Sequence, residues 1–192
     1  MINLLKPKKT QQLEIPEKYM YIKFRLPISK ISEGLLTNLK EKVRNTYIRP
    51  RITVAKEEDL PRITRIYNRA WLTSNTPFRQ MNTEQFNLLF HHPNYTFLIA
   101  QVYGIDAGFL IICYEGINNE LGVLVGLGIN PQFQRKGVGT ALALRAWQMF
   151  SMRNLKEIQC EIFHENYKSL SFARSVGFED YALTVNYIEE II

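Results

Sequence analysis

The sequence predicts an α/β protein in which helices cover the faces of a mixed β-sheet. Short apolar runs typical of strands alternate with amphipathic stretches of helical spacing. Two of the apolar runs are joined by the tight turn Tyr103-Gly104-Ile105-Asp106, which indicates a β-hairpin. In the second half of the chain, strands and helices alternate as in β-α-β units, so some strands there should be parallel. Hydrophobic residues make up 46% and charged residues 22% of the 192 residues, as is usual for a globular protein.

The N-terminal part of the chain differs from the rest in charge. Residues 1–51 carry 12 Lys and Arg against 4 Asp and Glu, a net +8, and the remaining residues carry 12 against 14, a net −2. An aromatic-rich stretch at residues 18–26 predicts a strand, and apolar residues at helical spacing after Ser32 predict a helix. The pair Arg49-Pro50 marks a break. We therefore divide the chain into a basic extension, residues 1–50, and a main domain, residues 51–192.

The extension is too small to form a core alone. We expect its apolar faces to pack on the main domain or on a second copy of the chain, which makes a homodimer one arrangement to test. Its positive charge is compatible with nucleic-acid binding. We favour a solvated charged face and do not expect nucleic acid as a partner.

The main domain is predicted to follow the order β-α-α-β-β-β-α-β-α-β. Acidic residues begin its first helix, where the helix dipole favours them, Asn82 or Thr83 caps the second, and Gly177 ends the last. The predicted strands are residues 51–55, 95–102, 107–114, 121–129, 155–163 and 181–191, and the predicted helices are 57–71, 81–90, 137–153 and 166–176.

Other features limit the compartment and the cofactors. The longest strongly apolar run, residues 121–129, is far too short to span a bilayer, and the N-terminus lacks a signal-peptide pattern. Cys113 and Cys160 show no metal-binding spacing, so we expect two buried thiols in a reducing compartment and no metal site. We expect a cytoplasmic protein with no membrane partner.

The stretch Asn130 to Trp147, NPQFQRKGVGTALALRAW, predicts an anion site. It places a polar loop and two cations before the glycines that begin a helix. Helix N-termini leave backbone N–H groups unpaired, and glycines let a ligand approach them closely. The alternative is a tight turn whose glycines serve packing only.

Two common phosphate-binding motifs do not fit this stretch. A Walker A loop needs GxxxxGK[ST], which the sequence lacks. A dinucleotide-binding turn needs a third glycine where Leu142 stands, and it has no room for the residues between the strand and Gly137.

The stretch resembles the acetyl-CoA motif of the GCN5-related N-acetyltransferases, [QR]-x-x-G-x-[GA]. Gln134 to Gly139 match this motif, after Asn130-Pro131. The next motif of the family is similar to Cys160-Glu161-Ile162, then Asn166, then Gly177-Phe178. The resemblance covers residues 51–185.

The resemblance implies that central strands 121–129 and 156–163 splay apart and hold the pantetheine of acetyl-CoA. Backbone near residues 127–129 would pair with pantetheine, and the amides of residues 135–140 would bind the pyrophosphate. The implied cofactor-binding residues are Leu127, Gly128, Ile129, Gln134, Arg135, Lys136, Gly137, Val138, Gly139, Thr140 and Asn166.

The chain departs from the family at its usual catalytic positions. Many members have a proton-donating Tyr seven residues after the Asn, where this chain has Ala173, and a basic Glu on the fourth strand, where 121–129 has no acid. We take Glu161 and Tyr181 as candidate catalytic residues. His164, Tyr187 and, in the acceptor region, Phe78 and Arg79 are weaker candidates.

The leading hypothesis is an acetyl-CoA-dependent N-acetyltransferase that transfers the acetyl group directly to a primary amine. The acceptor would be a protein N-terminus, a lysine or a small amine. The alternative is a non-catalytic acyl-CoA-binding module with a regulatory role, which the missing Tyr and Glu favour.

Overall fold

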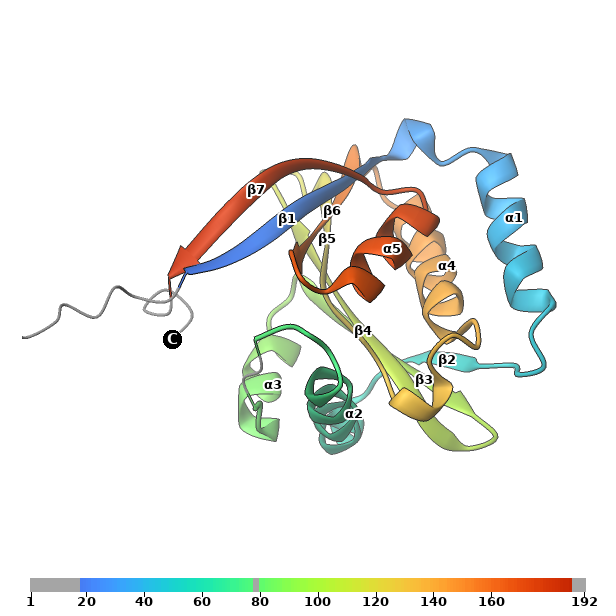
Figure 1. The fold of residues 1–192 in the computed structure, drawn as a ribbon, viewed down its shortest axis with the longest axis vertical. Coiled ribbons are helices and arrows are strands. Elements are labelled where there is room, and N and C mark those ends of the chain that lie inside the picture. Colours follow the sequence, from blue (N-terminus) through green and yellow to red (C-terminus); the bar gives the residue numbers. More distant parts are fainter. Residues whose placement is uncertain (1–17, 78–79, 188–192) are drawn as a thin grey trace, which may run out of the picture.

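The computed structural model describes residues 18–77 and 80–187, in which seven strands form one sheet (Figure 1). The strand order is β2-β3-β4-β5-β6-β1-β7, and the neighbours are antiparallel except for β5 and β6, which run parallel. The mixed sheet confirms the predicted fold class. The strands are β1 (Lys18–Pro27), β2 (Arg51–Val54), β3 (Tyr95–Val102), β4 (Ile105–Glu115), β5 (Leu121–Ile129), β6 (Glu157–Phe163) and β7 (Glu179–Tyr187).

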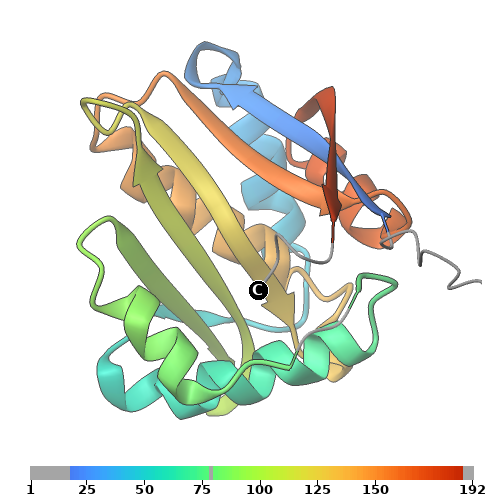
Figure 2. The same ribbon diagram turned by 90° about the vertical axis from the view of Figure 1, so that its left-hand side faces the viewer.

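Helices cover both faces of the sheet (Figures 1 and 2). Helices α2 and α3 pack on one face, and α1, α4 and α5 pack on the other. Strand β4 is buried on both faces. Phe109 and Ile111 pack in the core beneath α2 and α3, and Leu110 and Ile112 pack in the core beneath α1, α4 and α5. The helices are α1 (Glu33–Arg44), α2 (Leu60–Leu72), α3 (Thr83–Phe90), α4 (Val138–Ser151) and α5 (Tyr167–Ser175), with 3-10 turns at Ile28–Lys30, Glu57–Asp59 and Pro131–Phe133.

The N-terminal strand β1 lies inside the sheet, between β6 and β7. Tyr21 stands opposite Phe163 of β6 on one side and opposite Thr184 of β7 on the other. Phe24 and Leu26 alternate with outward residues of β1 and are almost completely buried, at 0% and 1% exposure. The strand of the extension therefore joins the core of its own chain.

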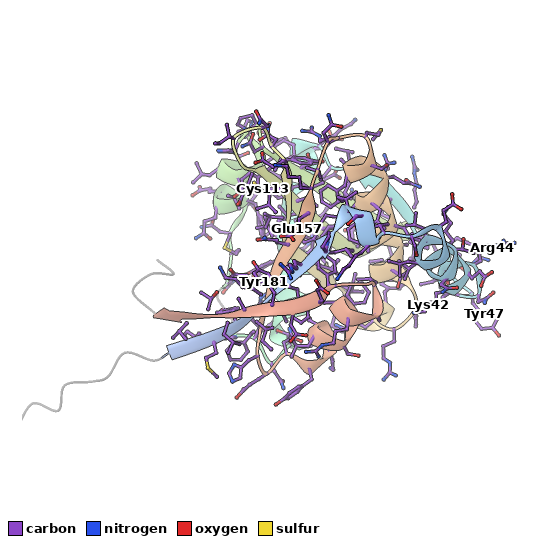
Figure 3. All side chains as sticks on the ribbon, turned by 90° about the horizontal axis from the view of Figure 1, so that it is seen from above. Lys42, Arg44, Tyr47, Cys113, Glu157 and Tyr181 are labelled. Carbon is purple, nitrogen blue, oxygen red and sulfur yellow. The ribbon has the colours of Figure 1, made fainter. Side chains whose placement is uncertain are left out.

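Helix α1 packs on α4 through Leu39, which is 1% exposed. Ser32 caps the helix predicted after it, because its hydroxyl accepts a hydrogen bond from the amide of Leu35 at 3.1 Å. Lys42 and Arg44 project outward at the end of this helix, and so does Tyr47 just after it (Figure 3). In α1, the apolar side thus faces the body, and these two charged side chains face outward.

Most predicted elements differ from the observed ones by one to four residues at an end, and three of these differences have a clear cause. The helix predicted from residue 57 begins as a 3-10 turn, and α2 starts only at Leu60. Strand β4 begins at Ile105, because Tyr103 and Gly104 both have positive φ angles, 52° and 77°, and make the tight hairpin turn themselves. Strand β7 begins at Glu179, and residues 188–191 of its predicted span lie outside the described residues.

Candidate active site

The parallel strands β5 and β6 pair only at their first residues. The pairing runs from Leu121 opposite Glu157 to Val123 opposite Gln159, and within the described residues it goes no further. Strand β5 stays paired with β4 as far as Ile129. The two parallel strands then diverge, as Figure 2 shows. The second half of β5 therefore has backbone N–H and C=O groups facing β6 without a strand partner.

The three strand residues expected to contact pantetheine lie on this unpaired stretch. Leu127 and Ile129 are partly buried, and Gly128 is buried. Gly128 also has a packing role, because a Cβ there would come within 2.3 Å of Cε1 of Phe109. The Phe109 ring in turn lies 6.2 Å from the ring of Trp71 on α2. The glycine thus lets an aromatic cluster approach the backbone beside the gap.

A β-bulge interrupts β5 at the level where the gap opens. Ile111 of β4 pairs with Gly126 and Ile112 pairs with Leu124, so Val125 has no partner on β4. Its side chain is 45% exposed. Bulges re-aim backbone groups and often lie beside active sites. This one leaves Val125 without a strand partner on β4, two residues after the pairing with β6 ends.

The loop after β5 has the conformation that an anion site requires. The side-chain amide of Gln134 donates to the carbonyl of Ile129 at 3.2 Å, which ties the loop to the end of β5. Arg135 and Gly137 have left-handed φ angles of 58° and 82°. Left-handed residues in a turn direct successive N–H groups into a concavity that binds anions. The side chains of Arg135 and Lys136 are exposed beside it.

Helix α4 adds its free amides to this loop. Ala141 donates to the carbonyl of Gly137 at 2.9 Å and thereby closes the first turn. The amides of Val138, Gly139 and Thr140 precede that bond, and none of them has a hydrogen-bond acceptor among the described residues. Together with the helix dipole, these amides supply the free donors that the predicted anion site requires, and the site itself stays a prediction.

Both glycines of the motif also make close contacts. A Cβ on Gly139 would lie 3.3 Å from Cζ of Phe172 on α5, and one on Gly137 would lie 2.9 Å from Cγ2 of Thr46. Both glycines therefore have a packing role, as the alternative explanation of the motif states. It does not account for the exposed cations or for the unpaired amides.

Asn166 caps helix α5 at the end of β6. Its Oδ1 accepts from the amide of Ser169 at 3.2 Å, and its Nδ2 donates to the hydroxyl of Thr76 at 2.8 Å. The second bond joins the end of β6 to the loop between α2 and α3. The Asn166 amide keeps a second N–H and a second lone pair, which could serve the contact with pantetheine that the resemblance implies.

Glu161 lies on β6, beside the gap. Continuing the β5–β6 register by two residues would place it opposite Val125. Its carboxylate is 43% exposed and lies 3.2 Å from Nζ of Lys23 on β1. Tyr21 shares that face of β1, and burial, followed by the charge of Glu161, raises the pKa of its hydroxyl. The extension thus supplies two side chains beside the candidate base.

Tyr181 lies farther from the gap than Glu161 does, because β1 separates β7 from β6. Tyr181 is 40% exposed, and the Arg25 guanidinium lies 5.2 Å from the centroid of its ring. His164 is turned toward β1, where its Nδ1 lies 3.2 Å from the carbonyl of Met20. Figure 3 labels Tyr181 on the β7 side of the sheet. The structure does not bring Tyr181 and Glu161 into contact.

Other candidate positions are filled differently. Ala173 is 4% exposed and packs in the core beneath α1, α4 and α5. Tyr187 is the last residue of β7, and Phe78 and Arg79 lie outside the described residues.

Sequence reasoning missed several features of this region. The bulge at Val125 and the positions of Lys23 and Tyr21 depend on strand pairing, which has no local signal. The spacing of Arg62, Arg65 and Arg69 does indicate one shared face of α2.

The two cysteines are free and buried. Burial, with a smaller effect of the Glu161 charge, raises the pKa of Cys160 to about 12, so this thiol stays protonated at neutral pH. Within the described ranges no cluster of three or more His, Cys, Asp or Glu is placed to bind a metal ion. In the same residues, each helix is too short or too polar to cross a membrane.

Comparison with known proteins identifies the class. A model of the acetyltransferase (GNAT) family matches residues 60–178. The match spans more than half of the chain and includes the gap, the loop and Asn166. The chain belongs to this family and is an N-acetyltransferase.

Solved structures show the same fold. The ribosomal-protein-S18-alanine N-acetyltransferase of Escherichia coli is 19% identical, with a TM-score of 0.59 over 70% of this chain and 80% of its own. The PaiA N-acetyltransferase of Thermoplasma acidophilum, solved in complex with coenzyme A, is 17% identical, with a TM-score of 0.60 over 72% and 99%. An aminoglycoside acetyltransferase from an uncultured soil metagenomic sample, solved with sisomicin, is 20% identical, with a TM-score of 0.55 over 67% and 87%.

Proposed function

We propose that this protein binds acetyl-CoA between β5 and β6 and transfers the acetyl group directly to a primary amine. The observation that carries the proposal is the unpaired second half of β5, which ends at a loop of free amides. An extended pantetheine chain can pair with such a strand edge, and a pyrophosphate suits the amides and cations at its end. A related structure was solved in complex with coenzyme A.

In this proposal the ligand has three parts, each with its own backbone contacts. Leu127, Gly128 and Ile129 would pair with pantetheine, and the amides of residues 135–140 would hold the pyrophosphate. The thioester would then lie near Val125, whose bulged backbone has no partner on β4. A fixed N–H donor at that point would stabilise the negative charge that develops on the thioester oxygen.

The transfer itself needs no covalent enzyme intermediate. The amine nitrogen attacks the thioester carbon, the C–S bond breaks, and CoA leaves as a thiolate that takes up a proton. Glu161 is our candidate for the base that removes the proton of the attacking ammonium, directly or through water. Lys23, at 3.2 Å, would hold the Glu161 carboxylate in place.

The acid that protonates the thiolate is not the residue usual in the family. Ala173 has no hydroxyl and is buried in the core. Tyr181 remains our candidate, and because β1 separates its strand from β6, it would act through water. A thiolate is a fair leaving group, so water alone would suffice if Tyr181 does not serve.

The acceptor class is a primary amine on a protein N-terminus, a lysine or a small molecule. Structural relatives act on acceptors as different as a ribosomal protein and, by its name, an aminoglycoside. Acceptor-binding loops vary widely on one scaffold. We place the reaction in the cytoplasm, which the two free thiols support.

The experiment is a panel of amines with acetyl-CoA, in which thiol release is followed and the acetylated product is identified by mass spectrometry. We expect amine-dependent thiol release with at least one class of acceptor. Saturable acetyl-CoA binding without transfer to any amine would instead identify a non-catalytic acyl-CoA-binding module. Absence of acetyl-CoA binding would overturn the proposal altogether.

A further inference from the structure

A small basic pocket opens between helix α2 and the loop that follows β5. Its volume is about 140 Å³. Three arginines of α2 line it together with Asp106 at the start of β4 and Gln132 of the loop; the arginines are Arg62, Arg65 and Arg69. Three arginines outnumber the two carboxylates near them, Asp106 in the lining and Asp59 beside Arg62, so the pocket is electropositive.

The three arginines have different partners. Arg62 is held by carboxylates: its Nε lies 3.0 Å from Asp106, and Nη1 bonds to Asp59. Hydrogen bonding to Asp106 raises the pKa of Arg62. Arg65 and Arg69 are exposed and have no carboxylate partner among the described residues. The pocket thus has one anchored and two uncompensated guanidinium groups.

The position of the pocket points to the phosphate end of the cofactor. Asn130 and Gln132 line it, and the same loop continues to the free amides at Arg135 and beyond. The proposed reacting centre near Val125 lies five residues before Asn130, a distance of about 17 Å in an extended strand. The pocket therefore borders the start of the loop that would hold the pyrophosphate, at the end of β5 away from the thioester.

The size of the pocket limits its ligand. Pockets that enclose drug-sized molecules measure about 300–1,000 Å³, so 140 Å³ suits a single phosphate group. Arginine forks bind phosphate oxygens in pairs, and a monoester dianion matches two uncompensated cations. CoA carries one such group, the 3′-phosphate of its ribose, next to the pyrophosphate.

We propose that Arg65 and Arg69 bind the 3′-phosphate of CoA, so that this enzyme distinguishes CoA from 3′-dephospho-CoA. The inference rests on the proposed acetyl-CoA site. It adds a second anion subsite, on α2, to the one at the start of α4. A phosphate or carboxylate carried by the acceptor is the competing occupant.

The test is a calorimetric comparison of CoA and 3′-dephospho-CoA with the full-length protein. The wild-type protein should bind CoA at least about 10-fold more tightly, as hydrogen bonds to charged groups imply. In the double variant Arg65→Gln, Arg69→Gln, CoA affinity should fall by about the same factor, and 3′-dephospho-CoA affinity should change little. Arg145→Gln, an exposed arginine on α4 bonded only to Gln148 within the described residues, is the matched control and should behave like wild type.

Two results would overturn the inference. Equal affinity of the wild-type protein for both ligands would show that the pocket does not bind the 3′-phosphate. An equal loss for both ligands in the double variant would mean that the arginines act on the pyrophosphate or on the loop. Failure of the wild-type protein to bind either ligand would overturn the acetyl-CoA site as well, so the two proposals fail in different ways. Circular dichroism of the variants confirms folding.

Discussion

Substitutions of single residues at the start of α4 can distinguish a ligand-binding site from a turn whose glycines serve packing only. Gly139 faces Phe172 at a distance that a Cβ would make tight, 3.3 Å, and it also precedes the first closed turn of the helix. A methyl group and a carboxylate at this position separate the two roles. Both crowd the ring, but only the carboxylate repels a pyrophosphate.

Gly139→Asp is expected to abolish the rise in melting temperature that CoA produces in the wild-type protein, because a ligand that binds only the folded state stabilises it. Gly139→Ala should keep most of that rise and report the steric cost alone. Gly34→Asp, in the first turn of α1, carries the same charge away from the site. Differential scanning fluorimetry measures all three, and an undiminished CoA shift in Gly139→Asp would place the anion site elsewhere.

Glu161 is expected to affect turnover more than binding. If it is the base, Glu161→Gln should lower kcat by about 10²-fold or more while the affinity for CoA stays unchanged. Glu179→Gln is the control, since Glu179 also pairs with cations on or next to β1, Arg25 and Lys30, but lies on β7. Steady-state kinetics on a confirmed acceptor test this prediction. A kcat of the Glu161 variant equal to that of the wild-type protein would show that Glu161 is not the base.

At the scale of elements, the order of strands and helices after residue 51 follows from the sequence, because hydrophobic periodicity and turn residues are local signals. The anion loop was predictable for the same reason, since its glycines and cations are contiguous. The place of β1 was not, because pairing with both β6 and β7 depends on partners far along the chain. The bond between Asn166 and Thr76 and the pocket on α2 likewise need the assembled fold.

Strand β1 should contribute as much to stability as a central strand does. Phe24 is fully buried and Met20, on the same strand, is 39% exposed. Phe24→Ala is expected to lower the free energy of unfolding by about 3–5 kcal/mol, the usual cost for a buried Phe. Met20→Ala should cost far less. Urea unfolding measures both, and similar small costs would show that β1 is only loosely held.

For the whole molecule, the division of the chain at residue 50 remains a prediction, and the sheet indicates that the two parts depend on each other. Removing residues 1–50 would leave β6 and β7 as separated edges with their backbone groups unpaired. We expect residues 51–192 alone to aggregate or to unfold at a much lower urea concentration. Size-exclusion chromatography and urea unfolding test this, and an equally stable monomer would contradict it.

The pairing of β1 with β7 also has a kinetic consequence. Lys18 stands opposite Tyr187, so the sheet joins the two ends of the described chain. Contacts of such long sequence separation slow folding, because a large loop must close before they form. During synthesis β1 leaves the ribosome well before β6 and β7, its two partner strands. Its aromatic residues therefore stay unpaired until those strands have been made, and this strand is where we expect a chaperone to act.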